Sequence, residues 1–192
     1  MFECALALFS EHGFDRVSVR DIARAVGIKE SSIYNHYESK QALLDEMCNR
    51  FVETLSISRP PLSEIDKMLQ KTSPKEIMKA LISAYGRQID ETVSQMARLV
   101  FSEQFHNDAA RHIMMFDIMQ NNASYYEEIL TLMQQKGRLK PCDKHILANV
   151  FNNEQVMLCM MYANCKSEDE FLEVSQMMQS SAEYLFAPLE QL

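Results

Sequence analysis

The apolar and polar residues of the first fifty positions alternate with the period of short α-helices. The first apolar stripe, at 5–9, ends near Gly13, and glycine commonly terminates a helix. Two further stripes, at 22–28 and 33–37, are brief. A longer one follows Ser39, which is a suitable N-cap residue. The pattern therefore predicts a run of helices in which the middle two are short.

The second of these helices has a clear start signal and an abrupt end. Ser18 and Asp21 have the spacing of a capping box, in which each side chain accepts a hydrogen bond from the other residue's backbone amide. Gly27 follows after only about two helical turns, and we expect Ile28 to point back to the core. Two short helices joined by a tight glycine turn cross steeply, as in a helix–turn–helix motif.

In a helix–turn–helix motif the second helix enters the major groove of DNA, so its exposed face is the candidate binding surface. That face is polar and rich in hydrogen-bonding groups; its residues are Lys29, Glu30, Ser31, Ser32, Asn35 and His36. Arg20 and Lys40 fall in the first turns of the flanking helices, where backbone N–H groups favour phosphate. The alternative is a structural three-helix bundle whose polar face is only solvated.

Helical periodicity continues beyond a break at 59–61. The sequence 73–76 is a strong helix start, and the pattern then runs to Phe105 with a kink or restart expected at Gly86 or at 90–91.

Three more helical segments follow. One begins at Asn107 or Asp108 and runs to about Lys136, the next covers 143–163, and the last opens after Ser167. With only 4 Gly and 5 Pro in 192 residues, turn-rich sandwiches and barrels are disfavoured, and we predict an all-α protein.

The remaining composition limits the cellular setting and the chemistry. No uninterrupted apolar run approaches the roughly 18 residues of a membrane span, and the N-terminus has no secretory pattern. The 5 cysteines include no C-x-x-C pair and indicate reduced thiols in a cytoplasmic protein. No common catalytic motif occurs, and Cys142 and His145 have no second ligand pair, so we expect no enzyme activity, metal or cofactor.

The net charge of −8 counts against a protein that holds nucleic acid by bulk positive charge. Any DNA contact must therefore come from a few well-placed cations and helix dipoles.

A dense set of motifs lies within residues 5–47: they are Phe9…Gly13-Phe14, Ser18-Val19-Arg20-Asp21-Ile22-Ala23, Val26-Gly27-Ile28, Tyr34-Asn35-His36-Tyr37 and Ser39-Lys40…Leu43-Leu44. Together they resemble the DNA-binding domain of the tetracycline-repressor (TetR) family of bacterial transcription regulators. The resemblance implies an N-terminal three-helix DNA-binding domain at 1–50 and a C-terminal helical ligand-binding and dimerisation domain at 51–192. It also implies a ligand-responsive repressor that an unidentified small-molecule effector releases from its operator.

The resemblance further implies which residues bind double-stranded DNA; these are Ser18, Arg20, Lys29, Glu30, Ser31, Ser32, Tyr34, Asn35, His36 and Lys40. Tyr34, His36 and Lys40 are expected to hold phosphates. Glu30 departs from what a phosphate-rich surface favours, but a carboxylate accepts a hydrogen bond from cytosine N4.

Methionine is frequent, with 14 residues and no tryptophan. Such soft side chains suit a pocket for hydrophobic ligands, and they also serve as ordinary core filler. The candidates for the effector pocket are Met96, Met115, Phe116, Met119, Tyr126 and Met157.

The segment 156–163 is apolar nearly all round, so a helix there needs two buried faces. The resemblance implies that this helix and the last one form a homodimer interface; its candidate residues are Met160, Met161, Phe171, Val174 and Met178. A dimer would place two recognition helices about 34–36 Å apart on a pseudo-palindromic operator. The alternative is an internal core helix of a monomer.

A second class of function stays open at the level of sequence. The negative charge and Glu30 are compatible with a helical small-molecule-binding protein or enzyme whose headpiece is vestigial. A catalytic cluster in the C-terminal half would favour that class.

Overall fold

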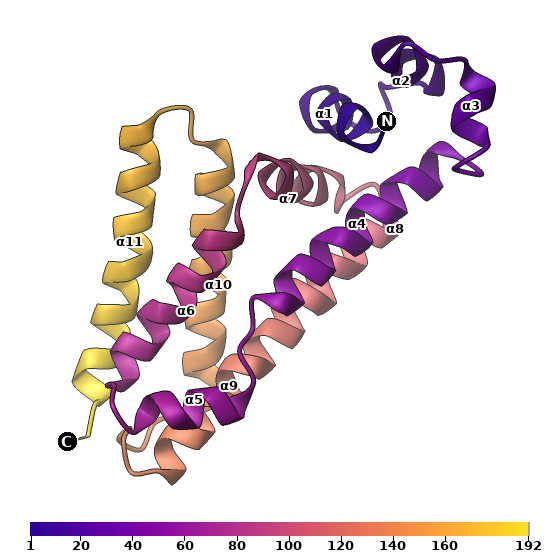
Figure 1. Cartoon of the computed structure of the whole chain (residues 1–192). Coiled ribbons are helices and arrows are strands. Elements are labelled where there is room, and N and C mark those ends of the chain that lie inside the picture. The colour runs from indigo at the N-terminus through magenta and orange to yellow at the C-terminus, as the bar shows by residue number, and fades with distance from the viewer. Residues whose placement is uncertain (192) are drawn as a thin grey trace. The chain divides into compact units, whose positions relative to one another are not determined.

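The computed structural model describes residues 1–191, which are mostly helical (Figure 1). Within this range the only β-type pairing is an isolated bridge between Leu139 and Glu190. The prediction of an all-α fold is therefore confirmed. No helix of the described range has the length and apolar character that a membrane crossing requires.

The chain forms two compact units, which we describe separately. The first contains residues 1–55 and 89–114, and the second contains 56–88 and the residues from 115 onward. This division by compactness differs from the functional division at 50/51 expected from the sequence, because residues 89–114 group with the N-terminal helices. The functional division into 1–50 and 51–192 stays a prediction.

The helices of the first unit are α1 (Phe2–His12), α2 (Val19–Val26), α3 (Glu30–Tyr34), α4 (Lys40–Ile57), α7 (Glu91–Glu103) and α8 (Asp108–His112). Helix α1 packs against α2 and α7, while α2 packs on α3. Leu6, Phe9, Ile22 and Leu44 are completely buried, as their helical spacing predicts. The rings of Phe9 and Phe14 meet edge to face at 5.2 Å, so the loop after α1 is part of the same core.

The predicted capping box at the start of α2 is present. The backbone N–H of Asp21 donates to Ser18 Oγ at 3.2 Å, and the backbone N–H of Ser18 donates to Asp21 Oδ2 at 3.0 Å. The helix ends at Gly27 in the left-handed region, with φ 77°, as the glycine predicted.

The expectation that Ile28 returns to the core is wrong. Its side chain is 38% exposed, whereas that of Ile33 is 3% exposed. The backbone N–H of Ile28 donates to Ala23 O at 3.0 Å and closes the turn. The buried position beyond the turn is occupied by Ile33 on α3, and Ile28 stays at the surface.

The elements of the second unit are α5 (Leu62–Leu69), α6 (Pro74–Gln88), α9 (Asn122–Gln135), α10 (Lys144–Asn164), α11 (Glu168–Phe186) and the 3₁₀ turn η2 (Ala187–Leu189). Helix α10 packs against α9 and α11, and α11 packs against α6 (Figure 1). The rings of Tyr126, Phe151 and Phe186 form a buried series, with edge-to-face centroid distances of 4.9 and 5.2 Å. These aromatic contacts hold three helices of the unit together.

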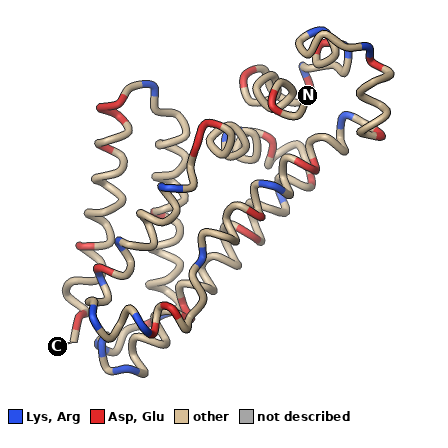
Figure 2. Tube along the Cα trace, in the orientation of Figure 1, with Lys and Arg blue, Asp and Glu red and all other residues tan. Residues whose placement is uncertain are grey.

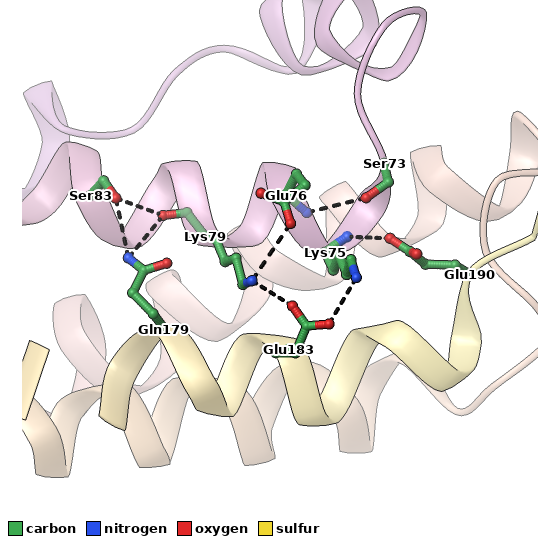
Figure 3. Close-up of polar contacts among 8 residues, drawn as sticks. All are labelled: Ser73, Lys75, Glu76, Lys79, Ser83, Gln179, Glu183 and Glu190. Carbon is green, nitrogen blue, oxygen red and sulfur yellow. Dashed lines mark hydrogen bonds and ion pairs between the residues drawn. The ribbon is translucent and has the colours of Figure 1, made fainter. Parts of the chain in front are cut away.

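Helices α6 and α11 are also joined by polar contacts (Figure 3). Glu183 accepts hydrogen bonds from the ammonium groups of both Lys75, at 2.8 Å, and Lys79. Farther along, Gln179 Nε2 donates to Ser83 Oγ at 3.1 Å. Near the chain end, the backbone N–H of Lys75 donates to Glu190 Oε1 at 3.1 Å. The two helices are thus connected along most of their shared length.

The long helix predicted from 107 or 108 to about 136 is present, but its middle is a π-helix, η1 (Ile113–Asn121), between α8 and α9. Tertiary hydrogen bonds reach its carbonyl groups. Asn152 Nδ2 donates to Ile118 O at 3.1 Å and to Met119 O at 3.2 Å, and Arg59 Nη2 donates to Asp117 O at 3.2 Å. The π-helical segment thus accepts hydrogen bonds from two other parts of the second unit.

Of the two positions predicted for a kink or restart, Gly86 and 90–91, the second is confirmed. Gly86 lies within α6, and the restart is at Asp90, whose carboxylate accepts a hydrogen bond from the backbone N–H of Val93 at 2.8 Å. An N-cap signal therefore located the boundary better than the glycine did.

Candidate nucleic-acid interface

Helices α2 and α3 form a tight corner in the first unit. The positive φ of Gly27 reverses the chain, and α3 begins three residues later at Glu30. Ile22, Ala23 and Ile33 are buried inside the corner. Since these apolar positions face inward, the polar positions of both short helices face solvent, as a helix–turn–helix motif requires.

Most of the residues that we expected at the DNA are exposed; these are Ser18, Arg20, Lys29, Glu30, Ser31, Tyr34, Asn35 and His36. Ser32 and Lys40 are half-buried. The corner therefore gathers hydroxyl, amide, imidazole and charged groups on short helices, where donors and acceptors are available to base edges and phosphates.

Arg20 and Glu30 form an ion pair across the corner. The distance from Arg20 Nε to Glu30 Oε1 is 3.0 Å, and the two side chains are 74% and 45% exposed. Sequence analysis placed both residues on the candidate surface but did not predict that they pair. They lie ten residues apart on different helices, so no local sequence signal marks the contact.

Lys40 has a structural role that the sequence analysis missed. Its ammonium donates to Phe14 O at 2.8 Å and to Val17 O at 3.0 Å, and it lies 4.0 Å from the centroid of the Phe14 ring. An ammonium has three N–H donors, so two are occupied by the loop between α1 and α2. The phosphate contact expected of Lys40 stays a prediction. At most one N–H group of the ammonium remains available for it.

The same loop is held from its other side by Glu103 of α7. Glu103 is 7% exposed, and its Oε1 accepts a hydrogen bond from the backbone N–H of Phe14 at 3.1 Å. Asn107, the N-cap of α8, donates from Nδ2 to Gln41 Oε1 of α4 at 3.1 Å. These long-range contacts explain why residues 89–114 are compact with the N-terminal helices.

Figure 2 shows Lys and Arg interspersed with Asp and Glu along the helices of the first unit, without a long basic tract. This distribution agrees with the net charge of −8. Binding of a polyanion at the corner must therefore depend on individual cations such as Arg20 and Lys29.

The residues expected to line an effector pocket occupy different environments. Met96 is buried in the first unit. In the second unit Tyr126 is buried within the core, Met119 is half-buried, and the other candidates, Met115, Phe116 and Met157, are exposed. Tyr126 is thus a packing residue in this structure, and the assignment of the pocket stays a prediction.

The residues expected at a dimer interface also fall into two groups, one accessible to solvent and one buried. Met161 and Phe171 are exposed and Met160 is half-buried, whereas Val174 and Met178 are covered by the core of their own unit. Other large apolar side chains of α10 and α11 are exposed as well; they are Ile146, Val150, Met157, Leu172, Met177 and Tyr184. The apolar surface of these two helices therefore consists largely of residues outside the set predicted for the interface.

Two of the cysteines are unreactive because burial keeps them protonated. Burial raises the pKa of Cys48 to about 12 and that of Cys159 to about 11, so both remain thiols at neutral pH. Among the described residues, no three His, Cys, Asp or Glu side chains are grouped as metal ligands would be.

Residues 2–47 match the family model described as "Bacterial regulatory proteins, tetR family". Over 55 residues the chain is 40% identical to the HTH-type transcriptional repressor KstR2 of Rhodococcus jostii, a match that covers 29% of this chain and 27% of that protein. The chain thus aligns with only about a quarter of the length of this curated relative.

Two solved structures share the fold over nearly the whole chain. The ketosteroid transcriptional regulator KstR2 of Mycobacterium tuberculosis has a TM-score of 0.70 at 20% identity, covering 100% of this chain and 93% of its own. A transcriptional regulator from Saccharomonospora viridis in complex with choline has a TM-score of 0.73 at 16% identity, covering 100% and 96%. At these identities the likeness concerns the fold.

Proposed function

We propose that the protein is a DNA-binding transcriptional repressor that a small-molecule effector releases from its operator, because residues 2–47 match the model of the tetR family of bacterial regulatory proteins. The observation that carries this proposal is the α2–α3 corner, which turns its apolar residues inward and its polar residues outward. The curated relative with 40% identity over 55 residues is itself named a transcriptional repressor.

A homodimer completes the proposed DNA-binding form. One corner reads one half-site, and a two-fold pair reads a pseudo-palindrome with recognition helices about 34–36 Å apart. The exposed apolar side chains of α10 and α11, including Met157, Met161 and Leu172, supply a surface for pairing. Since its target is chromosomal DNA, the protein would act in the bacterial cytoplasm.

The effector is proposed to bind in the helical C-terminal half, at 51–192. The structural neighbour from S. viridis was solved with choline, and another neighbour is named a ketosteroid regulator. An effector shifts the protein away from its DNA-competent state only to the extent that it binds the other state more tightly. An enzyme with a vestigial headpiece is not favoured, because the matching relatives are named as transcription regulators.

The test is footprinting with fragments of the source genome at low and moderate salt. We expect protection of a pseudo-palindromic site and a logarithm of the binding constant that falls linearly with the logarithm of salt concentration, with a slope of about −0.9 for each phosphate neutralised. If no fragment shows a protected site even at low salt, DNA binding is excluded. Choline and a steroid serve as the first effector probes. A compound that is an effector is recognised because it lowers the occupancy of the protected site.

A further inference from the structure

We propose that Glu30 is a specificity-determining residue that accepts a hydrogen bond from the N4 amino group of a cytosine in each operator half-site, and that Arg20 is the positioning residue that holds its carboxylate there. This inference rests on the proposed DNA-binding function. It assigns to the two residues a joint role that depends on their ion pair, with Arg20 Nε 3.0 Å from Glu30 Oε1.

The location of the pair is the first reason. Arg20 lies in the first turn of α2, and Glu30 is the first residue of α3, so the pair bridges the two helices of the corner. Both side chains are exposed, at 74% and 45%. A solvent-exposed ion pair of this kind contributes little to folding stability. The role proposed for the pair is therefore geometric: it biases where the carboxylate points and adds little to stability.

Electrostatics gives the second reason. A bare carboxylate at a DNA surface is repelled by the phosphates, and that repulsion would exclude Glu30 from the groove. The guanidinium of Arg20 cancels the charge locally. Its contact with Glu30 uses the Nε donor, and a guanidinium carries five N–H donors in all, so donors on Arg20 remain for a phosphate of the same strand.

The acceptor character of the carboxylate decides which base it selects. An ionised carboxylate has no donor, so in the major groove it can bind only an amino group. Guanine and thymine present acceptors at the corresponding edge and are rejected. Adenine presents N6 beside the acceptor N7, whereas cytosine presents N4 without that neighbouring acceptor, and cytosine is therefore preferred.

The molecule contains a matched control for Arg20. Arg24 lies on the same helix, is also 74% exposed and has its own acidic partner, Asp21, with Arg24 Nη1 3.6 Å from Asp21 Oδ1. Asp21 belongs to the capping box of α2 and is not on α3. Arg20→Gln and Arg24→Gln therefore remove the same charge, but only the first removes a contact to Glu30. Glu38→Gln, at an exposed position after α3, controls for the charge removed by Glu30→Gln.

The experiment measures dissociation constants of the full-length wild-type protein and the four variants at one salt concentration. The ligands are the operator found by footprinting and a set of its single base-pair variants. For the wild-type protein we expect one position in each half-site where replacing cytosine weakens binding by about tenfold. Glu30→Gln moves the preference there to adenine, because a glutamine amide pairs with N6 and N7. Arg20→Gln reduces the preference for cytosine, while Arg24→Gln and Glu38→Gln retain it.

The inference is overturned if Glu30→Gln has the same base preferences as the wild-type protein, or if Arg20→Gln weakens all sequences equally, which is the behaviour of a plain phosphate contact. Circular dichroism and thermal unfolding of each variant separate a loss of folding from a loss of base preference. A wild-type protein that binds no operator at all refutes the proposed function as well, so the two failures are distinguishable.

Discussion

At the scale of single residues, charged side chains around the corner act on the backbone as well as on solvent. Lys40 bonds two carbonyl groups of the loop between α1 and α2, and Glu103 bonds a backbone N–H of the same loop. The loop precedes Ser18, the N-cap of α2, so the conformation of the loop sets the position of α2 relative to α1. The position of the candidate DNA surface thus depends on backbone contacts made by Lys40, one of its own candidate residues, and by Glu103, which lies outside that surface.

We predict that Lys40→Ala destabilises the first unit by about 1–3 kcal/mol, because two carbonyl acceptors lose a charged donor. Hydrogen exchange of the α1 and α2 amides measures this loss. Lys29→Ala is the control, since Lys29 is exposed and its side chain makes no capping bond. Equal protection of the amides in the two variants would contradict a structural role for Lys40.

At the scale of elements, the ion pairs between α6 and α11 are a candidate for pH-dependent stability (Figure 3). Hydrogen bonds from Lys75 and Lys79 lower the pKa of Glu183 to about 2 from its ordinary value of 4.5. The same contacts raise the pKa of both lysines. A carboxyl with a depressed pKa in the folded state stabilises that state above its unfolded pKa and loses the contribution as the pH falls.

We therefore predict that the contact between α6 and α11 is at full strength above pH 4.5 and weakens progressively as the pH falls from 4.5 to about 2. Hydrogen exchange of α6 and α11 at pH 6, 4 and 3 follows this change. Glu183→Gln should show a smaller difference in exchange protection between pH 6 and pH 3 than the wild-type protein. Glu128→Gln, at an exposed position outside this cluster, should show the same difference as the wild-type protein. An unchanged pH dependence in Glu183→Gln would refute the assignment.

At the scale of the whole molecule, the proposed function requires two copies of the chain. The exposed apolar side chains of α10 and α11 are the surface that we propose for pairing, and a charge placed among them would have to be buried without a partner. Val174 and Met178, which the sequence analysis had included, are already covered within one chain.

We predict that Met161→Glu converts the dimer to a monomer in sedimentation experiments and weakens operator binding at least tenfold, because a single corner reads only one half-site. Phe105 is also an exposed apolar residue, but it lies in the first unit, away from α10 and α11 in the sequence. Phe105→Glu should therefore leave the oligomeric state unchanged. If Met161→Glu sediments as the wild-type protein does, the proposal that this face is the dimer interface is refuted.

The sequence by itself determined the features that depend on residues within a few positions of one another. The capping box of Ser18 and Asp21, the end of α2 at Gly27 and the polar face of α3 are of this kind, because the interacting groups are neighbours on the chain. They were sufficient to predict the corner and most of the exposed residues on it, while the all-α fold followed from helical periodicity along the chain and from the low counts of Gly and Pro.

The tertiary structure alone decided the contacts between distant positions. The pair of Arg20 with Glu30 spans ten residues, that of Lys40 with Phe14 spans 26, and that of Glu103 with Phe14 spans 89. The burial of Val174 and the hydrogen bond from Asn152 to Ile118 O of η1 are likewise contacts between distant positions. Periodicity shows that a residue is apolar and on a helix, but which neighbour covers it is set by how the helices pack.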